Sequence, residues 1–146
     1  MQQKIDWSAI SPDESEKLKD ELVEMWEASV RSTHHFLAEK DIRFFKPLVR
    51  DKYIPVVELY TIRNEQNRIA AFMGLSDELI EMLFVHPEEQ GKGYGKQLIE
   101  FAIYIKYSLT ELYPPSKAIL QLLNIASSVI FLFITSIFYS RPFHRS

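Results

Sequence analysis

The sequence predicts an α/β domain with the element order helix, helix, strand, strand, strand, glycine-rich loop, helix. Three observations support this order. Apolar residues recur at helical spacing between residues 12 and 51, three β-rich runs follow between residues 55 and 85, and three glycines precede a final amphipathic run. At 146 residues the chain is long enough for one domain with a substantial hydrophobic core.

Two helices are predicted at the start of the chain. The first begins at Pro12, because Ser11 can cap it and Glu14 completes a capping box. It continues to about residue 31, and the second helix spans about residues 41–51. The apolar positions that define them are Leu18, Leu22, Met25, Trp26 and Val30 in the first, and Ile42, Phe45, Leu48 and Val49 in the second.

Three strands are predicted next. Residues 55–62 are rich in β-branched and aromatic side chains, and residues 64–67 form a polar turn before a partner strand at 69–74, which predicts a hairpin. Asp77 and Glu78 mark another turn. The third strand covers residues 79–85 and ends at His86-Pro87.

A glycine-rich loop at residues 90–96 is the strongest functional signal. Gly91, Gly93 and Gly95 allow backbone dihedral angles that other residues avoid, and they let the chain pass close to a ligand. Free N–H groups at the start of the following helix favour an anion, so the loop predicts a phosphate or diphosphate site. It does not fit GxxxxGK[ST], and it reads GxGxG where a dinucleotide-binding loop needs GxGxxG.

The loop resembles the [QR]xxGx[GA] signature of the GNAT superfamily of N-acetyltransferases, which it matches as Gln90-Gly91-Lys92-Gly93-Tyr94-Gly95. The preceding run, residues 83–87, is similar to the fourth strand of that family and its exit turn. Segments 22–26, 29–30 and 32–37 resemble the first helices of small bacterial members. The resemblance therefore covers about residues 14–103.

This resemblance implies a GNAT-like mixed sheet flanked by helices, which binds acetyl-CoA as co-substrate and transfers its acetyl group to a primary amine of a small molecule or peptide. It implies that amides of the fourth strand hold the pantetheine arm and the thioester carbonyl. Loop amides, aided by lysine charge, would hold the diphosphate. The cofactor-binding residues expected on this basis are Leu83, Phe84, Val85, Gln90, Gly91, Lys92, Gly93, Tyr94, Gly95 and Lys96.

The catalytic base stays open between several candidates. They are Glu81 in the third predicted strand, the pair His34-His35 after the first helix, and His86. Each also has an ordinary structural explanation. Glu81 would be a solvated strand residue, the histidine pair would have one packed member, and His86 would lie in an exposed turn.

No general acid is assigned. In many GNAT proteins a tyrosine in the helix after the fifth strand protonates the leaving thiolate. Tyr104, Tyr107 and Tyr113 lie nearby in sequence but do not match that motif. Trp26 and Phe36 are expected in the core, although the first helix of the family and its following loop border the acceptor site.

The composition changes near Tyr104. Residues 1–103 hold 13 of the 17 basic residues, 19 of the 20 acidic residues and all four glycines, so this part carries a net charge of −6. Residues 104–146 carry +3, and residues 118–140 contain no charged side chain. We therefore expect a GNAT-like part with the acetyl-CoA site at 1–103, and an atypical apolar tail at 104–146 in which the fold is incomplete or altered.

Three interpretations of the tail stay open. A frameshift or rearrangement would have replaced the family's sequence. A membrane anchor would fit the 23 uncharged residues in length, although Gln121, Asn124 and several hydroxyl side chains argue against it. A divergent half-domain would use residues 129–139 as a buried strand. The alternatives to an enzyme are thus a non-catalytic acyl-CoA-binding or self-associating remnant, whose oligomer forms through the tail, and a tail-anchored membrane protein.

The composition argues against several other classes. A chain without cysteine has no disulfide framework, thiolate metal site or thiol nucleophile, and it fits a reducing cytosol. A net charge of −3 gives no footprint for nucleic acid, and the polar, acidic start does not resemble a secretory signal peptide. The histidines lack the carboxylate-rich spacing of a metal site. We expect a cytoplasmic protein without a resident metal.

Overall fold

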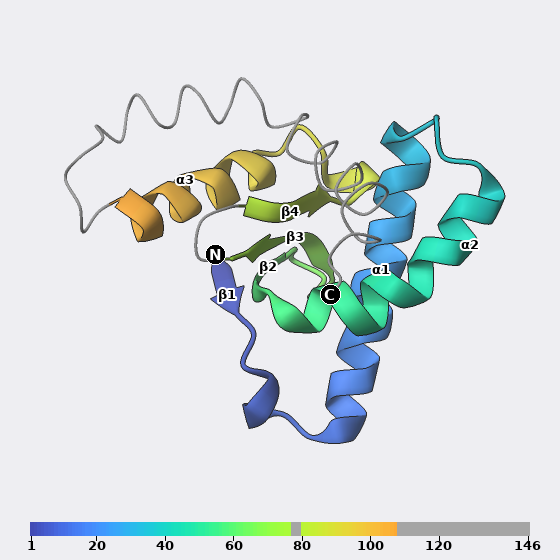
Figure 1. The fold of residues 1–146 in the computed structure, drawn as a ribbon. Helices are drawn as coiled ribbons and strands as arrows, with labels where there is room; N and C mark the ends of the chain where they lie inside the picture. Colours follow the sequence, from blue (N-terminus) through green and yellow to red (C-terminus); the bar gives the residue numbers. More distant parts are fainter. Residues whose placement is uncertain (77–79, 108–146) are drawn as a thin grey trace.

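The computed structural model describes residues 1–76 and 80–107 (Figure 1). In this part of the chain an antiparallel sheet, in the order β1-β2-β3-β4, has α1 and α2 on one face and α3 on the other. The predicted α/β class is confirmed. The strands are β1 (Gln2–Lys4), β2 (Glu58–Arg63), β3 (Ile69–Leu75) and β4 (Ile80–Val85), and the helices are α1 (Pro12–Thr33), α2 (Glu39–Leu48) and α3 (Tyr94–Tyr107).

The start of α1 is the predicted one. The amide of Ser11 donates to Glu14 Oε1 at 3.1 Å, and the amide of Glu14 donates to Ser11 Oγ at 3.2 Å, which is the expected capping box. Helix α2 begins earlier than predicted, because Asp41 is its third residue and accepts from the amide of Ala38 at 2.9 Å. It ends at Leu48, and a π-helical turn (Val49–Tyr53) replaces the predicted last turn.

The strands differ from the prediction at their ends. Strand β2 begins at Glu58, because residues 54–56 form a 3₁₀ turn around Pro55. It pairs with β3 as the predicted hairpin. Strand β1 was not predicted, since three polar residues carry no apolar alternation; it pairs antiparallel with β2. The predicted turn at residues 77–78 and the first predicted residue of the third strand lie outside the described residues.

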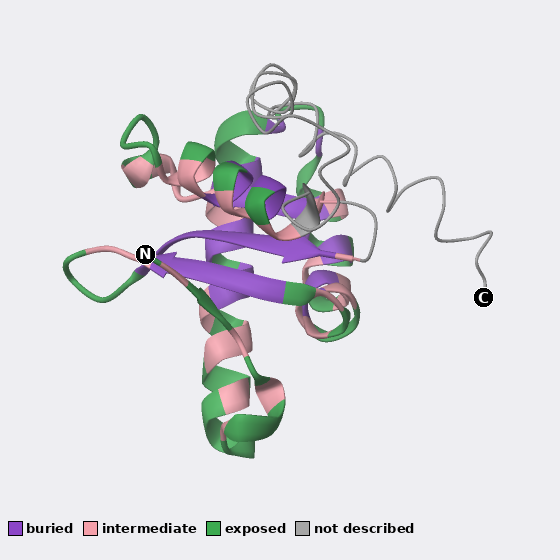
Figure 2. Ribbon diagram, turned by 90° about the vertical axis from the view of Figure 1, so that its left-hand side faces the viewer, coloured by how far each residue is buried: buried purple, intermediate pink, exposed green. Residues whose placement is uncertain are grey.

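Strand β3 is buried at every one of its positions, because helices cover both faces of the sheet (Figure 2). On the α1 face Phe72 packs with Phe84 and Trp26, and the two phenylalanine rings lie 5.6 Å apart. On the α3 face Met73 packs in a second cluster with Leu83 and residues of α3. The core residues on that helix are Leu98, Ile99, Ala102 and Ile103.

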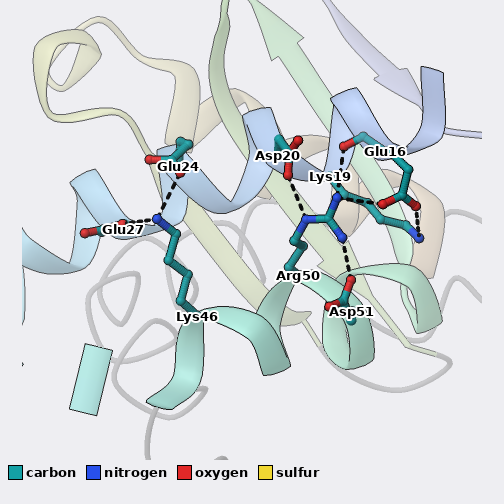
Figure 3. A network of polar contacts seen from close by, with 8 residues as sticks. All are labelled: Glu16, Lys19, Asp20, Glu24, Glu27, Lys46, Arg50 and Asp51. Carbon is teal, nitrogen blue, oxygen red and sulfur yellow. Dashed lines mark hydrogen bonds and ion pairs between the residues drawn. The ribbon is translucent and has the colours of Figure 1, made fainter. Parts of the chain in front are cut away.

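A network of ion pairs joins α2 and the turn after it to α1 (Figure 3). Arg50 contacts Asp20 and Glu16, each at 2.8 Å. Lys46 contacts Glu24 at 2.9 Å and Glu27 at 2.6 Å. Exposed ion pairs contribute little stability one by one, about 0–1 kcal/mol each. We therefore infer that this network orients α2 along α1. The buried apolar cluster supplies the stability.

The two aromatic residues predicted in the core behave differently. Trp26 is fully buried, as predicted. The prediction for Phe36 is wrong, because 57% of its surface is exposed. Helix α1 ends at Thr33, so Phe36 lies in the following turn and its ring contacts that of His34 at 5.5 Å between centroids.

Helix α3 crosses the position at which the composition changes. Ile103 is buried in the core, Tyr104 is 68% exposed, and the helix continues to Tyr107. Within the described ranges no helix is long and apolar enough to cross a membrane. The tail beyond Tyr107, with the candidate strand at residues 129–139 and Tyr113, lies outside the described residues, so its three interpretations stay open. The division of the chain at 103 stays a prediction.

Gly74 marks a close approach between β3 and its neighbours. A Cβ atom at this position would lie 2.6 Å from Val57 Cγ2 and 2.8 Å from Met82 Cγ. We predict that Gly74→Ala lowers the free energy of unfolding by about 1–3 kcal/mol through overpacking, measured by urea denaturation. The double variant Gly74→Ala/Val57→Ala removes the nearer clash and should cost less than the sum of its single variants. Additive costs would contradict this explanation.

Candidate active site

Strand β4 is one of the two outer strands of the described sheet, so one of its edges faces away from β3. The amide of His86 donates to the carbonyl of Ala70 at 2.8 Å. Together with the register of β3 and β4, this bond shows which β4 residues direct their N–H groups to β3. Hydrogen-bonded pairs alternate in an antiparallel ladder. Phe84 therefore directs its N–H group to β3, whereas Leu83 and Val85 direct theirs to the open edge. Of the three β4 residues predicted to hold pantetheine, two thus direct their N–H groups to the open edge, and their role stays a prediction.

The glycine-rich loop has the backbone geometry that the sequence predicts. Gly91 and Gly93 have φ values of +83° and +90°, in the region that favours glycine. A Cβ atom at either position would meet nothing within 4 Å, so the requirement comes from the backbone angle and not from crowding. Helix α3 follows directly. Its hydrogen-bond ladder starts with the 2.9 Å bond from the amide of Gln97 to the carbonyl of Gly93.

The amides of Tyr94, Gly95 and Lys96 precede that ladder, as the first N–H groups of a helix do. They point out of the helix start, where its dipole favours an anion. A Cβ atom at Gly95 would lie 3.4 Å from Val85 Cγ2, so the first turn of α3 lies against the last residue of β4. The segment that carries the outward amides of β4 is therefore in contact with the segment that carries the first amides of α3.

Most of the loop side chains point to solvent. Lys92, which was expected to add charge to a diphosphate, contacts Glu89 Oε1 at 3.0 Å. Glu89 Oε2 accepts in turn from Asn64 Nδ2 at 2.9 Å, which links the loop to the β2–β3 turn. A polar cavity of about 200 Å³ lies between that turn and residues 86–92. The exposed loop residues are Gln90, Gly91, Lys92, Gly93 and Lys96.

Glu81 lies at the other end of β4, at an irregularity in the sheet. The register moves from Gly74↔Met82 to Leu75↔Ile80, so Glu81 is one extra residue on β4. Such a bulge changes the direction of a side chain, and bulges are frequent beside active sites. Glu81 lines a cavity of about 270 Å³; the other lining residues are Tyr53, Val56, Val57, Ser76 and Met82.

The structure does not bring the candidate bases together. His34 is buried, with Nδ1 2.8 Å from Thr33 Oγ1, whereas His35 is exposed. His86 caps the short 3₁₀ turn at residues 87–89 through Nδ1, which accepts from the amide of Glu88 at 3.1 Å. It lies five residues from Glu81, or about 16 Å along an extended strand. Glu81 is the candidate that lines an apolar cavity.

Sequence reasoning missed the residues that complete both ends of β4. Tyr53 and Val57 line the Glu81 cavity from the segment between α2 and β2, and Asn64 and Glu89 support the glycine-rich loop. No local motif marks them, because contacts between distant segments create these sites. Within residues 1–76 and 80–107, no cluster of three or more histidine or carboxylate side chains could hold a metal ion.

Two glycines of the loop allow a matched test of this geometry. Gly93→Ala forces a Cβ atom onto a residue with φ +90°, and we predict a loss of about 1–2 kcal/mol in the free energy of unfolding. Gly95→Ala lies in a helix and meets only an ordinary contact, so its stability should stay within about 0.5 kcal/mol of the parent. Thermal unfolding of both variants measures the difference. Equal effects would contradict the positive-φ explanation.

Three comparisons place the chain among known proteins. A family model described as "Acetyltransferase (GNAT) domain" matches residues 31–140, which begins later than the resemblance at 14–103 and ends beyond it. The peptidyl-lysine N-acetyltransferases YjaB of Salmonella typhimurium and Escherichia coli are 33% and 35% identical to it over 91 residues. That stretch is 62% of this chain and 62% and 61% of theirs, so the chain spans less than two thirds of their length.

A solved structure gives the same result for the fold. The solution structure of apo-form YjaB from Escherichia coli superimposes with a TM-score of 0.59 and 28% sequence identity, and the match covers 72% of this chain and 65% of that one. The family match includes more than half of the chain. The chain belongs to the GNAT family of acetyltransferases.

Proposed function

We propose that this protein binds acetyl-CoA along the open edge of β4 and transfers the acetyl group to a primary amine. The observation that carries the proposal is a pair of outward amide groups on two segments that touch. One group belongs to Leu83 and Val85 on β4, and the other to the first turn of α3, which follows two glycines with positive φ. Such an arrangement offers donors to the pantetheine amides first and to the diphosphate next.

We further propose that the acceptor is the side chain of a lysine in a peptide. The curated relatives are named as peptidyl-lysine N-acetyltransferases, and the cavity beside Glu81 supports the same acceptor here. Sites for drug-sized ligands usually measure about 300–1,000 Å³. A cavity of about 270 Å³ suits one side chain better than a whole metabolite. Val56, Val57 and Met82 would contact the aliphatic stem of lysine, and Glu81 its nitrogen.

The proposed reaction needs an uncharged amine next to the thioester. Lysine titrates at a pKa of about 10.4, so a base must take a proton from nitrogen before or during attack. The nitrogen then bonds to the thioester carbon, and the coenzyme leaves as its thiolate. Glu81 lies two residues from Leu83, about 7 Å along the strand, so its carboxylate can reach this nitrogen directly or through one water. We propose Glu81 as the base.

A cytosolic location remains part of this proposal, and it is supported by the absence of cysteine in the whole sequence.

The non-catalytic alternative also has one observation in its favour. Tyr104, near the end of α3, is 68% exposed, so it does not lie in a closed site where it could act as a general acid. A protein that binds acetyl-CoA without transferring its acetyl group would support that alternative.

The binding step is tested by calorimetry with acetyl-CoA. We predict that Gly93→Asp weakens binding at least about tenfold, because it strains the loop and places a carboxylate where the diphosphate would lie. The matched control is Gln3→Glu, which adds the same charge on exposed β1, at the opposite edge of the sheet. Its affinity should equal that of the parent. Equal affinity of all three proteins, or binding by none, would contradict the proposal.

The transfer step is tested with Glu81→Gln and a lysine-containing peptide, by release of the coenzyme A thiol. We predict that kcat falls about 100-fold or more at neutral pH, the usual contribution of a general base, while the affinity for acetyl-CoA stays unchanged. The lost rate should return with rising pH, as the peptide amine loses its own proton. Glu58→Gln, an exposed carboxylate at the start of β2, serves as control. An unchanged kcat would exclude Glu81 as the base.

A further inference from the structure

Lys92 is not available to a ligand in the way that its position in the loop suggests. Its ammonium lies 3.0 Å from Glu89 Oε1, three residues earlier in the chain. The side chain of Lys92 is 58% exposed, whereas that of Glu89 is only 13% exposed. The lysine is thus the mobile partner and the glutamate the fixed one, because the surrounding protein restricts the more buried side chain.

Glu89 is held in place from a second direction. Its other carboxylate oxygen accepts from Asn64 Nδ2 at 2.9 Å. The side chain of Asn64 is itself fixed, since its Oδ1 accepts from the amides of Gln66 at 2.9 Å and Arg68 at 3.0 Å. The bond from Asn64 and the ammonium of Lys92 hold the pKa of Glu89 below its usual range, so this carboxylate stays ionised. A fixed, charged acceptor therefore lies beside the loop.

We propose that Glu89 competes with the diphosphate of coenzyme A for Lys92, and that this competition sets the affinity of the glycine-rich loop. A bound diphosphate would accept at the α3 amides, and Lys92 would have to leave Glu89 to add its charge to them. The favourable interaction of Lys92 with the diphosphate is thus partly offset by the loss of its ion pair with Glu89. The inference rests on the proposed function, because it assumes that the diphosphate lies at this loop.

The test compares the affinity of the full-length protein and its variants for coenzyme A, measured by calorimetry. Glu89→Gln keeps the shape of the side chain but removes the charge that holds Lys92. We expect it to tighten binding about threefold to fivefold, which corresponds to the strength of one exposed ion pair. Lys92→Met alone should weaken binding, because it removes the cation and leaves the ionised carboxylate of Glu89 unpaired beside the diphosphate. In the Glu89→Gln background, Lys92→Met should abolish the gain.

Glu88 provides the matched control, because it is an exposed carboxylate next to Glu89 in the same turn. Its backbone amide donates to His86 Nδ1, and this bond does not involve the carboxylate. Glu88→Gln removes the same charge from the same turn and should leave the affinity unchanged. An equal gain in affinity from Glu88→Gln would show that the loss of any negative charge in this turn tightens binding, and would exclude competition for Lys92 as the cause. A loss of affinity in Glu89→Gln, or a gain that persists in the double variant Glu89→Gln/Lys92→Met, would overturn the inference.

The failure of the inference can be told from the failure of the proposed function. If no variant binds coenzyme A, or if Gly93→Asp binds as the parent does, the diphosphate does not lie at the loop and the proposed function fails. If the parent binds, Gly93→Asp does not, and Glu89→Gln gives no gain, only the competition is excluded. Far-ultraviolet circular dichroism of each variant confirms that the fold is kept.

Discussion

The burial of β3 on both faces is the constraint on which the rest of the described structure depends. Its residues alternate between the α1 face, where Phe72 packs with Trp26, and the α3 face, where Met73 packs with Leu98. Full burial of one such side chain contributes about 1.5–3 kcal/mol. Helices are therefore held on both sides of the sheet. Strand β4 pairs with β3 on one side only, which leaves its other edge as the open edge of the described sheet.

The candidate site lies along that edge, because the two ends of β4 have different chemical environments. At the end of β4 the chain passes through the glycines into α3, whose first amides favour an anion. At its start the bulge at Glu81 places a single carboxylate beside an apolar cavity. A long ligand with a diphosphate at one end and a thioester at the other fits this order. The polarity of the strand thus predicts the direction in which acetyl-CoA would lie.

Local sequence signals predicted the features that depend on local physics. Ser11 with Glu14 located the start of α1, and the glycines at 91 and 93 have the positive φ that their pattern indicates. Features made by distant contacts could not be predicted in this way. Strand β1 has three polar residues and exists because β2 offers it an edge. The bulge at Glu81 results from the pairing of β4 with β3, and the contact of Lys92 with Glu89 is visible only in the folded turn.

The central claim is that amides of the β4 edge and of the glycine-rich loop hold coenzyme A. Two-dimensional NMR of the nitrogen-labelled protein, titrated with coenzyme A, tests it residue by residue. We predict large shifts for the amides of residues 91–96 and an alternating pattern on β4, strong at Leu83 and Val85 and weak at Phe84, whose N–H group points to β3. Shifts that leave the loop unaffected, or that do not alternate along the strand, would contradict it.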